Sequence, residues 1–264
     1  MDLNLNGKIA LVSGSTAGIG RAIATELALL GATVVVNGRT DARVAEAIEA
    51  IKADVPNAEL RGVAADLSTS LGCQGLVQAA PDVDILVNNL GIFEPKPFEE
   101  ITDRDWLRFF ETNVMSGVRL SRAYLPNMRE RKWGRIIFIS SESAVQIPAE
   151  MIHYGMTKTA QVAVARGLAE TTVNTAITVN TILAGPTSSE GVQEFVGTLA
   201  RQRGISAEEF EQEFFKSVRP SSLLQRFILP SEIAAMVAFV CSPAASAING
   251  AALRVEGGCV RSVL

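Results

Sequence analysis

The chain has 264 residues, of which 48% are hydrophobic and 20% are charged, and its formal net charge is -4 at pH 7. A globule of this length buries roughly 70% of the surface that its unfolded chain exposes, so it can fold without disulfides or a structural metal. The mildly acidic balance argues against a nucleic-acid partner, because such a partner requires a basic stripe on the protein.

Short apolar runs alternate with segments of helical periodicity along the chain. The spacing of apolar residues predicts strands over residues 9–12, 33–36, 60–65, 84–87, 135–139, 177–183 and 252–255. It predicts helices from the first glycine-rich turn to Leu30 and over residues 42–53, 71–80, 103–131, 154–174 and 231–241. Such alternation gives a parallel sheet covered on both faces, and right-handed crossovers make it doubly wound. We therefore expect a single α/β domain over residues 1–264 with a parallel, seven-stranded sheet.

One irregular region, residues 187–229, interrupts this alternation after the sixth expected strand. Its aromatic residues, spaced among many charges, predict two short amphipathic helices. Ligands of doubly wound sheets bind beyond the carboxyl ends of the strands. Because the region follows a strand end, we expect it to form a lid over the ligand site.

A glycine-rich turn, residues 14–20, joins the first expected strand to the first helix. Glycine permits a sharp turn and a close approach of the backbone to a ligand, and a helix N-terminus offers free N–H groups to an anion. A merely flexible turn is the alternative, but three glycines at a strand–helix junction favour a dinucleotide pyrophosphate. The candidate cofactor contacts here are Gly14, Ser15, Thr16, Gly18, Ile19 and Gly20.

The end of the second strand indicates which dinucleotide is bound. NAD sites usually place a carboxylate there for the ribose diol, whereas NADP sites place a cation near the 2′-phosphate. Residues 37–40 contain Arg39 and no carboxylate, and the first acidic residue is Asp41. An arginine can clamp a phosphate with two hydrogen bonds. We expect NADP, with NAD as the less favoured cofactor and a plain surface arginine as the alternative reading of Arg39.

Polar residues also follow the third and fourth strands. Asp66, which precedes Leu67, could accept a hydrogen bond from the adenine amino group or simply cap the next segment. Asn89, Leu90 and Gly91 end the fourth strand, where asparagines indicate either ligand contact or a plain turn. We include all five residues among the candidate cofactor contacts.

Tyr154 and Lys158 lie four residues apart at the start of a predicted helix, so they share one helix face. A phenol has a pKa of about 10, and a nearby ammonium stabilises the phenolate and lowers that pKa. Such a tyrosine can donate a proton to a ketone oxygen or accept one from an alcohol. The spacing alone also fits a chance surface contact, so the assignment depends on the residues around the pair.

Two further residues support a catalytic interpretation. Ser141 follows the fifth strand, where its hydroxyl can hydrogen-bond the substrate oxygen; Ser140 and Ser143 are rivals, and a turn cap is the alternative. Asn113 lies inside a long helical stretch, where asparagine is disfavoured. That misfit indicates a role such as a water relay to Lys158, with an exposed polar residue as the alternative.

The remaining reactive side chains give no metal or disulfide pattern. Cys73, Cys241 and Cys259 are far apart and odd in number, which fits a reducing compartment. His153 is the only histidine, so we expect no metal, and we expect this residue to be a rim or capping residue beside Tyr154. The polar N-terminus and short apolar runs fit neither a signal peptide nor a membrane span, so we expect a cytoplasmic protein.

Together these residues resemble the short-chain dehydrogenase/reductase family over nearly the whole chain. The matches to its glycine motif, its adenine-contacting aspartate and its N-N-A-G motif are Gly14, Gly18, Gly20, Asp66 and residues 88–91, with Ser13 in a threonine position. The matches to its catalytic tetrad, in order and spacing, are Asn113, Ser141, Tyr154 and Lys158. Leu90 in place of alanine and Ala184 in place of proline are departures.

The resemblance implies a Rossmann-type fold and an NAD(P)-dependent oxidoreductase that interconverts a ketone and a secondary alcohol. In that family Tyr154 would act as acid and base, and Lys158 would also hold the nicotinamide ribose. Gly185 and Thr187 would flank the nicotinamide carboxamide. The resemblance further implies a homodimer or homotetramer that pairs through the long central helices and the C-terminal strand.

The substrate is the least transferable property. An apolar set indicates a partly apolar substrate, such as a 3-oxoacyl thioester or a cyclic carbonyl compound; its members are Val145, Ile147, Met151, Leu183, Phe195 and Phe214. A non-catalytic dinucleotide-binding regulator is one alternative, but such a protein would not need the intact Tyr154 and Lys158. A lyase is another, and it usually comes with an altered glycine turn.

Overall fold

Seven parallel strands form one sheet in the order β3-β2-β1-β4-β5-β6-β7 in this computed structural model. The structure describes residues 1–263, except the side chain of Phe195. The strands are β1 (Ile9–Val12), β2 (Thr33–Gly38), β3 (Leu60–Ala64), β4 (Ile85–Asn88), β5 (Trp133–Ser141), β6 (Ala176–Ala184) and β7 (Ala252–Val255). The chain order reverses between β1 and β4, which is the place where open α/β sheets bind ligands. The predicted doubly wound, seven-stranded sheet is confirmed.

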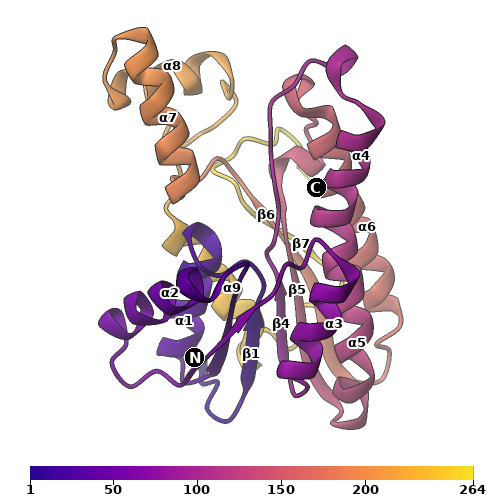
Figure 1. Cartoon of the computed structure of the whole chain (residues 1–264). Coiled ribbons are helices and arrows are strands. Elements are labelled where there is room, and N and C mark those ends of the chain that lie inside the picture. Colours follow the sequence, from indigo (N-terminus) through magenta and orange to yellow (C-terminus); the bar gives the residue numbers. More distant parts are fainter. Residues whose placement is uncertain (264) are drawn as a thin grey trace.

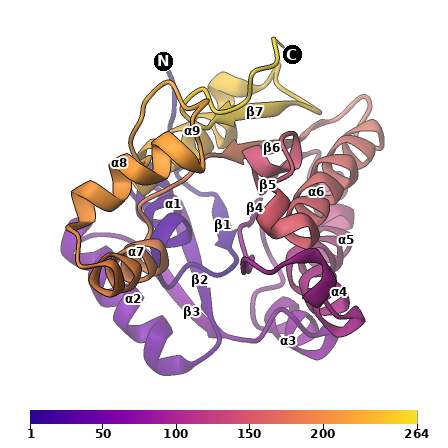
Figure 2. The same ribbon diagram turned by 90° about the horizontal axis from the view of Figure 1, so that it is seen from above.

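Helices cover both faces of the sheet (Figures 1 and 2). The α-helices are α1 (Gly18–Leu29), α2 (Asp41–Asp54), α3 (Ser70–Ala79), α4 (Asp103–Phe110), α5 (Ser116–Glu130), α6 (Ile152–Glu170), α7 (Glu190–Arg203), α8 (Ala207–Ser217) and α9 (Pro230–Cys241). The short helical turns are η1 (Phe98–Glu100), η2 (Glu111–Met115), η3 (Glu142–Ala144), η4 (Ala149–Met151) and η5 (Pro243–Ala245). One buried core contains residues of α1, α2 and α9, and the other contains residues of α3, α5 and α6.

The strands are continuous apolar runs because both of their faces are buried. Successive side chains of a strand point to opposite faces. In β1, Val12 belongs to the core under α1 and α9, whereas Leu11 belongs to the core under α3 and α5. Val36 and Val35 of β2 divide in the same way. This two-sided burial is typical of parallel sheets and explains why no polar alternation marks the strands in the sequence.

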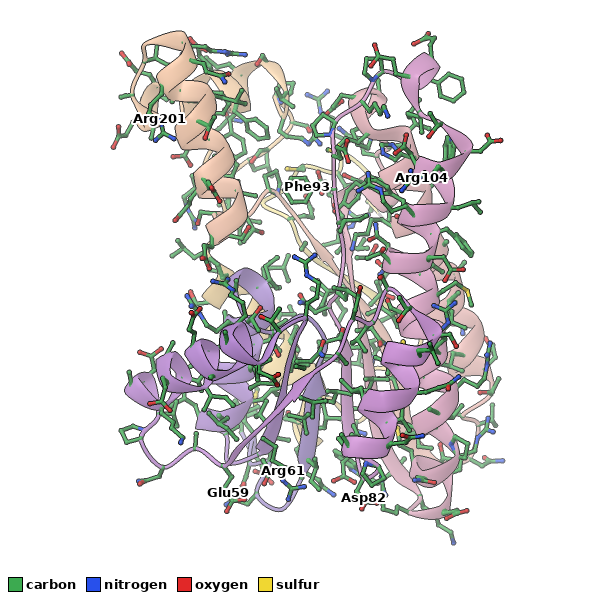
Figure 3. The ribbon with its side chains drawn as sticks, in the orientation of Figure 1. Glu59, Arg61, Asp82, Phe93, Arg104 and Arg201 are labelled. Carbon is green, nitrogen blue, oxygen red and sulfur yellow. The ribbon has the colours of Figure 1, made fainter. Side chains whose placement is uncertain are left out.

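The carboxyl ends and the amino ends of the strands have different surroundings. Figure 3 shows Phe93 and Arg104 toward the upper edge, where the strands end, together with Arg201 of the lid. It shows Glu59 and Asp82 at the opposite end, where β3 and β4 begin.

The lid helices α7 and α8 pack through their own small cluster of apolar residues rather than through the main cores. The two amphipathic helices predicted within residues 187–229 are confirmed.

Two helices differ from their predicted extents. The helix predicted over residues 103–131 is divided into α4 and α5 by the π-helical turn η2, which the apolar spacing did not indicate. The helix predicted to reach residue 174 ends at Glu170. Its last turn is closed by Thr171 and Thr172, whose hydroxyls donate to the carbonyls of residues 168 and 169. Asn174 then takes a left-handed backbone conformation, φ 60°, which no helix can continue.

The remaining expectations concern thiols, metals and membranes. All three cysteines are buried free thiols, and burial raises the pKa of Cys241 to about 12, which makes that thiol unreactive. Among residues 1–263 no group of three or more His, Cys, Asp or Glu side chains could hold a metal ion. No helix in that range is long and apolar enough to cross a membrane.

Candidate active site

The glycine turn between β1 and α1 is a tightly packed cradle. Gly14 and Gly18 have φ values of 63° and 53°, a left-handed conformation that glycine adopts without strain. Gly20 lies under the turn, where a methyl group would stand 2.4 Å from the carbonyl oxygen of Gly14. The helix begins after Ala17, which provides no side-chain cap. The N-terminal N–H groups of α1 therefore receive no help from a capping side chain, and the turn fits the phosphates of a dinucleotide.

Asparagine side chains from the ends of two neighbouring strands hold the glycine turn in place, and nothing in the sequence indicated the first of them, Asn37. Asn37, at the end of β2, accepts the N–H of Gly14 through Oδ1 at 3.1 Å and donates through Nδ2 to the carbonyl of Val63 at 3.1 Å. Asn89 donates to the carbonyls of Ser13 and Gly14 at 2.9 and 3.1 Å. Two asparagines thus fix the turn between β2 and β4.

Two serines beside the turn are used internally. The Ser13 hydroxyl accepts the N–H groups of Asn89 and Leu90 at 2.9 and 3.0 Å, which joins the glycine turn to the end of β4. Ser15 is fully buried; its hydroxyl donates to the carbonyl of Val12 and accepts the N–H of Asn37. Ser15 therefore lies beneath the turn as a supporting residue, whereas Thr16 and Ile19 are partly exposed.

The candidate adenosine contacts lie along the same edge. Arg39 follows β2, is exposed, and forms no salt bridge within residues 1–263. Asp66 follows β3, and its Oδ1 accepts the backbone N–H and the hydroxyl of Ser68 at 3.1 and 2.8 Å. Leu67 is buried in the core next to it. Asp66 therefore shapes the turn before α3, whose N-cap is Thr69, and its second carboxylate oxygen makes no hydrogen bond within the described residues.

The lid begins directly over the glycine cradle. Gly185 follows β6, and Thr187 donates its hydroxyl proton to the carbonyl of Gly185 at 2.8 Å. A methyl group on Gly18 would lie 3.0 Å from Cβ of Ser189, the residue that precedes α7. The chain between β6 and α7 therefore passes against the glycine turn.

Tyr154, Lys158 and Ser141 meet where β5 ends and α6 begins. Lys158 Nζ donates to the carbonyl of Ile139 at 2.9 Å and lies 5.6 Å from the centre of the Tyr154 ring. Ser141 lies beside the Tyr154 phenol, whose pKa it lowers. The rival serines are used elsewhere: Ser140 donates to the carbonyl of Lys158 at 2.8 Å, and Ser143 is buried. The structure brings together the three side chains expected from the sequence.

The protonation of this group follows from burial. Burial raises the pKa of the Tyr154 phenol, and the negative charge of Glu142 raises it further. The hydrogen bond from Ser141 and the positive charge of Arg219 act in the opposite direction but are weaker. Burial also lowers the pKa of Lys158 to about 8, against the opposing effect of Glu142. The sequence predicted that the phenol pKa is lowered by Lys158. That prediction is wrong for the protein without cofactor, because burial raises the phenol pKa.

Asn113 lies in the π-helical turn η2 and holds the chain that follows β4. Its Oδ1 accepts the N–H of Ile92 at 2.8 Å, and its Nδ2 donates to the Ile92 carbonyl and to Oγ1 of Thr157, both at 3.0 Å. Its own carbonyl accepts from Gln161 at 2.6 Å. Both amide protons are occupied, so in this structure the side chain positions the loop at Ile92. π-helical turns are frequent at functional sites.

The same loop connects the cofactor cradle with the catalytic group. A methyl group on Gly14 would lie 3.4 Å from Cα of Leu90, and one on Gly91 would lie 3.4 Å from Nζ of Lys158. Residues 90 and 91 thus fill the short interval between the glycine turn and the lysine. The candidate catalytic side chains and the glycine turn therefore lie at the same end of the sheet, where the strands end.

The structure also shows a buried ion pair that the sequence did not indicate. Glu142, next to the candidate serine, accepts the Ser141 hydroxyl proton and pairs with Nε of Arg219 at 3.1 Å. Arg219 also reaches Glu150 at 3.1 Å. Arg219 lies 77 residues along the chain from Glu142, so no local pattern links them.

The residues expected around the substrate are only partly at the site. Val145 and Ile147 are exposed beyond the end of β5. Leu183 is buried in β6 and offers no apolar surface to a substrate, whereas the partly exposed Phe214 of α8 packs on Phe215 and Phe227. Met151 is partly exposed, and the side chain of Phe195 lies outside the described part of the chain.

His153 is not the rim or capping residue expected from the sequence. It is fully buried, with its ring centre 4.0 Å from that of Phe109 and 6.0 Å from that of Trp106. Neither ring nitrogen has a hydrogen-bond partner in the described structure. Burial lowers the pKa of His153, so the neutral ring is the favoured form.

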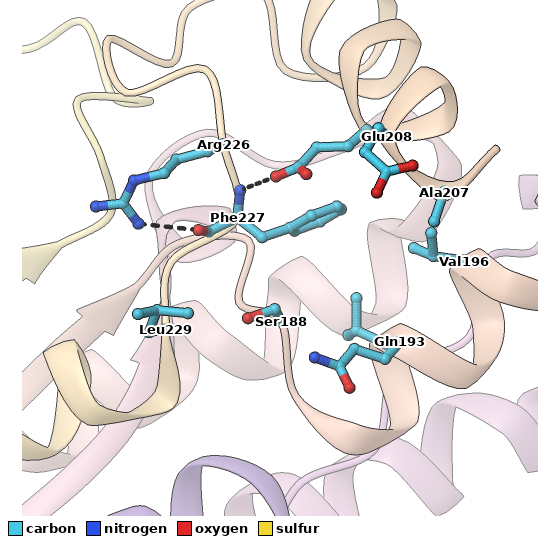
Figure 4. A pocket seen from close by; sticks show the side chains of 10 residues that line it. Ser188, Gln193, Val196, Ala207, Glu208, Arg226, Phe227 and Leu229 are labelled. Carbon is cyan, nitrogen blue, oxygen red and sulfur yellow. Dashed lines mark hydrogen bonds between the residues drawn. The ribbon is translucent and has the colours of Figure 1, made fainter.

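A cavity of about 600 Å³ lies within the lid (Figure 4). Its lining comes from α7, α8 and the segment before α9, and includes Val192, Val196, Ala207, Glu208, Phe227 and Leu229. The N–H of Phe227 donates to Glu211 at 2.7 Å, and Arg226 donates to the carbonyl of Phe227 at 3.0 Å (Figure 4). No candidate catalytic residue is among those that line it, so the cavity belongs to the lid.

Comparisons with known proteins show the family to which the chain belongs. Residues 8–199 match the sequence pattern of the family described as short chain dehydrogenase. The chain is 53% identical to the uncharacterized oxidoreductase YvaG of Bacillus subtilis over 100% of both chains. It is 34% identical to the D-beta-hydroxybutyrate dehydrogenase of Cupriavidus necator, over 97% of this chain and 99% of the relative. The L-sorbose reductase of Gluconobacter frateurii, solved with NADPH and L-sorbose, superposes with a TM-score of 0.94 at 31% identity and 100% coverage of both chains.

Proposed function

Because the chain belongs to the short-chain dehydrogenase/reductase family, we propose that it interconverts a ketone and a secondary alcohol by hydride transfer with NADP(H). One observation carries this proposal. Tyr154, Lys158 and Ser141 meet at the end of the sheet that holds the glycine turn, with Leu90 close to that turn and Gly91 close to Lys158. A regulator that only bound a dinucleotide would have no use for this group.

The proposed cofactor is NADP rather than NAD. The glycine turn fits a pyrophosphate, because its close packing leaves backbone rather than side chains toward the ligand. Arg39 is exposed at the end of β2 without a carboxylate partner among residues 1–263, so it is available to a ribose phosphate. The L-sorbose reductase that superposes on the chain was solved with NADPH, which supports the same choice.

Each side chain has a defined part in the proposed reaction. Bound NADPH would supply the hydride that adds to the carbonyl carbon. Tyr154 gives its phenol proton to the carbonyl oxygen as the carbon–oxygen double bond is reduced, and it takes that proton back when an alcohol is oxidised. A phenol with its usual pKa of about 10 is protonated at neutral pH, and burial raises that pKa further, so the proton is in place for reduction. Lys158 contributes a positive charge beside the ring and holds the ribose.

The substrate is proposed to be a ketone that places one side against Val145 and Ile147, the exposed apolar residues beyond β5. A 3-oxoacyl thioester or a cyclic ketone would meet that requirement. A polyhydroxylated ketone is a second candidate, favoured by the likeness to L-sorbose reductase and by the charged residues Glu142 and Arg219 beside the serine. We also propose a homodimer or homotetramer in the cytoplasm, with the long central helices and β7 as the contact surfaces.

The test is a panel of carbonyl compounds assayed by the loss of NADPH absorbance. The panel contains 3-oxoacyl thioesters, cyclic ketones and ketoses, each assayed with NADPH and with NADH. We expect turnover with one class and a preference for NADPH. Tight NADPH binding without turnover of any class, or of the matching alcohols with NADP⁺, would favour the non-catalytic regulator instead.

A further inference from the structure

The guanidinium of Arg219 is buried beside the candidate catalytic serine, although it comes from the lid region. Arg219 follows α8 and is 9% exposed. Its Nε donates to Oε1 of Glu142 at 3.1 Å, and Glu142 directly follows Ser141 in the chain. Burying charged groups is unfavourable, and a buried ion pair contributes little net stability compared with apolar residues of similar size. The position of this pair at the site is therefore the informative feature.

Arg219 has more hydrogen-bond donors than the protein uses. A guanidinium carries five N–H groups in a planar fork. Besides the bond from Nε to Glu142, Nη1 donates to Oε1 of Glu150 at 3.1 Å and to the carbonyl of Val218 at 3.0 Å. Nη2 makes no hydrogen bond to any of residues 1–263, and it is not fully enclosed by protein atoms. Its two N–H groups are therefore available to a ligand.

The carboxylates next to these donors have free capacity to accept. An ionised carboxylate has about four lone-pair sites. Glu142 uses Oε1 for Arg219 and Oε2 for the hydroxyl of Ser141. The side chain of Glu150 is 43% exposed and accepts from Arg219 through Oε1 alone. Unused N–H donors thus lie beside unused carboxylate lone pairs. This combination is complementary to hydroxyl groups, because each hydroxyl both donates and accepts.

The charges of this cluster, Glu142, Glu150 and Arg219, favour a neutral ligand. Two carboxylates face one guanidinium, so a carboxylate on the ligand would be repelled by two like charges. The cluster also acts on the phenol of Tyr154. Glu142 raises the pKa of that phenol after the larger effect of burial, whereas Arg219 lowers it. The cluster therefore lies near enough to Tyr154 for one substrate to meet both.

We propose that Arg219 and Glu142 bind hydroxyl groups of the substrate while Tyr154 faces its carbonyl oxygen, so that the substrate is a neutral, polyhydroxylated ketone. The inference rests on the proposed function and selects one of its substrate classes. Nη2 of Arg219 donates to a hydroxyl oxygen, and a carboxylate of the cluster accepts the hydroxyl proton. An apolar ketone would take water from Nη2 without replacing its hydrogen bonds, which is unfavourable.

The test measures binding of ketones to the NADPH complex of Tyr154→Phe, in which turnover does not interfere. Three ketones with five carbons are the probes: xylulose is polyhydroxylated, 2-pentanone is apolar, and levulinate carries a carboxylate. The change in NADPH fluorescence gives the Kd of each. We expect xylulose to bind at least about tenfold more tightly than either of the others, because hydrogen bonds to a charged group add affinity and unpaired donors reduce it.

Two variants of the cluster, made in the Tyr154→Phe background, separate recognition from folding. Arg219→Lys keeps a positive charge beside Glu142 but lacks the planar fork. The double variant Glu142→Gln with Arg219→Met leaves neither member of the pair buried as an unpaired charge. In both, the preference for xylulose over 2-pentanone should fall by about tenfold. The control Arg203→Met removes an exposed lid ion pair to Glu213, at 3.3 Å, and should keep the preference. Denaturant unfolding shows that each variant is folded.

The possible results separate this inference from the proposed function. The inference is overturned if the three ketones bind alike or not at all, if 2-pentanone or levulinate binds most tightly, or if both cluster variants keep the preference. None of these results depends on hydride transfer. Selective binding of xylulose together with no turnover of any ketone by the protein with Tyr154 intact would instead reject the proposed function and leave the binding site established.

Discussion

The glycine turn makes a quantitative prediction for the substitution Gly20→Ala. A methyl group at this position would lie 2.4 Å from the carbonyl oxygen of Gly14 and 2.5 Å from Nδ2 of Asn89. Neither neighbour is free to move, because Asn89 donates to the carbonyls of Ser13 and Gly14 and thereby holds the turn. The added carbon must therefore displace the turn that is proposed to hold the phosphates of the cofactor.

The expected loss of stability is the balance of three effects. Two hydrogen bonds of Asn89 contribute about 1 kcal/mol each, and forcing a methyl group into packed backbone costs about 1 to 3 kcal/mol. Alanine is better than glycine in a helix by about 1 kcal/mol, which offsets part of this. The free energy of unfolding should therefore fall by about 2 to 4 kcal/mol. Affinity for NADPH should fall at least tenfold, which corresponds to about 1.4 kcal/mol.

The assay pairs urea unfolding, followed by tryptophan fluorescence, with a fluorescence titration of NADPH binding. Gly75→Ala is the matched control, because Gly75 is an exposed residue of α3 with no atom within 4 Å of the added methyl group. The control should be unchanged or more stable by up to about 1 kcal/mol, with normal NADPH affinity. If Gly20→Ala matched the control in both measurements, the turn would not be the packed phosphate cradle described here.

Two further substitutions test other parts of the site. Arg39→Ala should raise the KM for NADPH more than the KM for NADH in steady-state kinetics, because only NADPH carries the 2′-phosphate; an equal effect on both would contradict the cofactor assignment. His153→Phe should remove a pH dependence of stability. Burial holds the pKa of this histidine in the folded protein below its usual value of about 6.5, which the unfolded chain keeps. The unfolded chain therefore binds more protons, and the folded parent loses stability as the pH falls below about 6.5. Denaturant unfolding at about pH 7 and about pH 5.5 should show the parent losing more than the variant, and parallel losses would mean that the buried ring does not titrate as inferred.

The sequence predicted the sheet well because parallel strands buried on both faces are continuous apolar runs. It predicted the glycine turn and the tyrosine–lysine pair because both are local patterns. The π-helical turn η2 escaped prediction, since the apolar spacing continues through Asn113 and the contact that stabilises it is with Ile92, 21 residues away. The end of α6 escaped because Thr171 and Thr172 are compatible with a helix until their hydroxyls take its last carbonyls.

Residues that act over long separations in the chain were missed for the same reason. The sequence does not indicate that Asn37 shapes the glycine turn, because its contact with Gly14 depends on the pairing of β1 with β2. Glu142 reads as an ordinary polar residue after a strand until Arg219 is brought to it from the lid. The pKa of Tyr154 was predicted in the wrong direction, because spacing shows the nearby ammonium but not the depth of burial.

The most direct test of the proposed chemistry is the substitution Tyr154→Phe, which removes the phenol oxygen and keeps the ring. The variant should bind NADPH with nearly the affinity of the parent, since the ring beside Lys158 is retained. Its turnover of the substrate found in the panel should fall by about 100-fold or more, the usual contribution of a positioned acid or base. Normal NADPH binding with turnover close to that of the parent would contradict the assignment of Tyr154 as the proton donor.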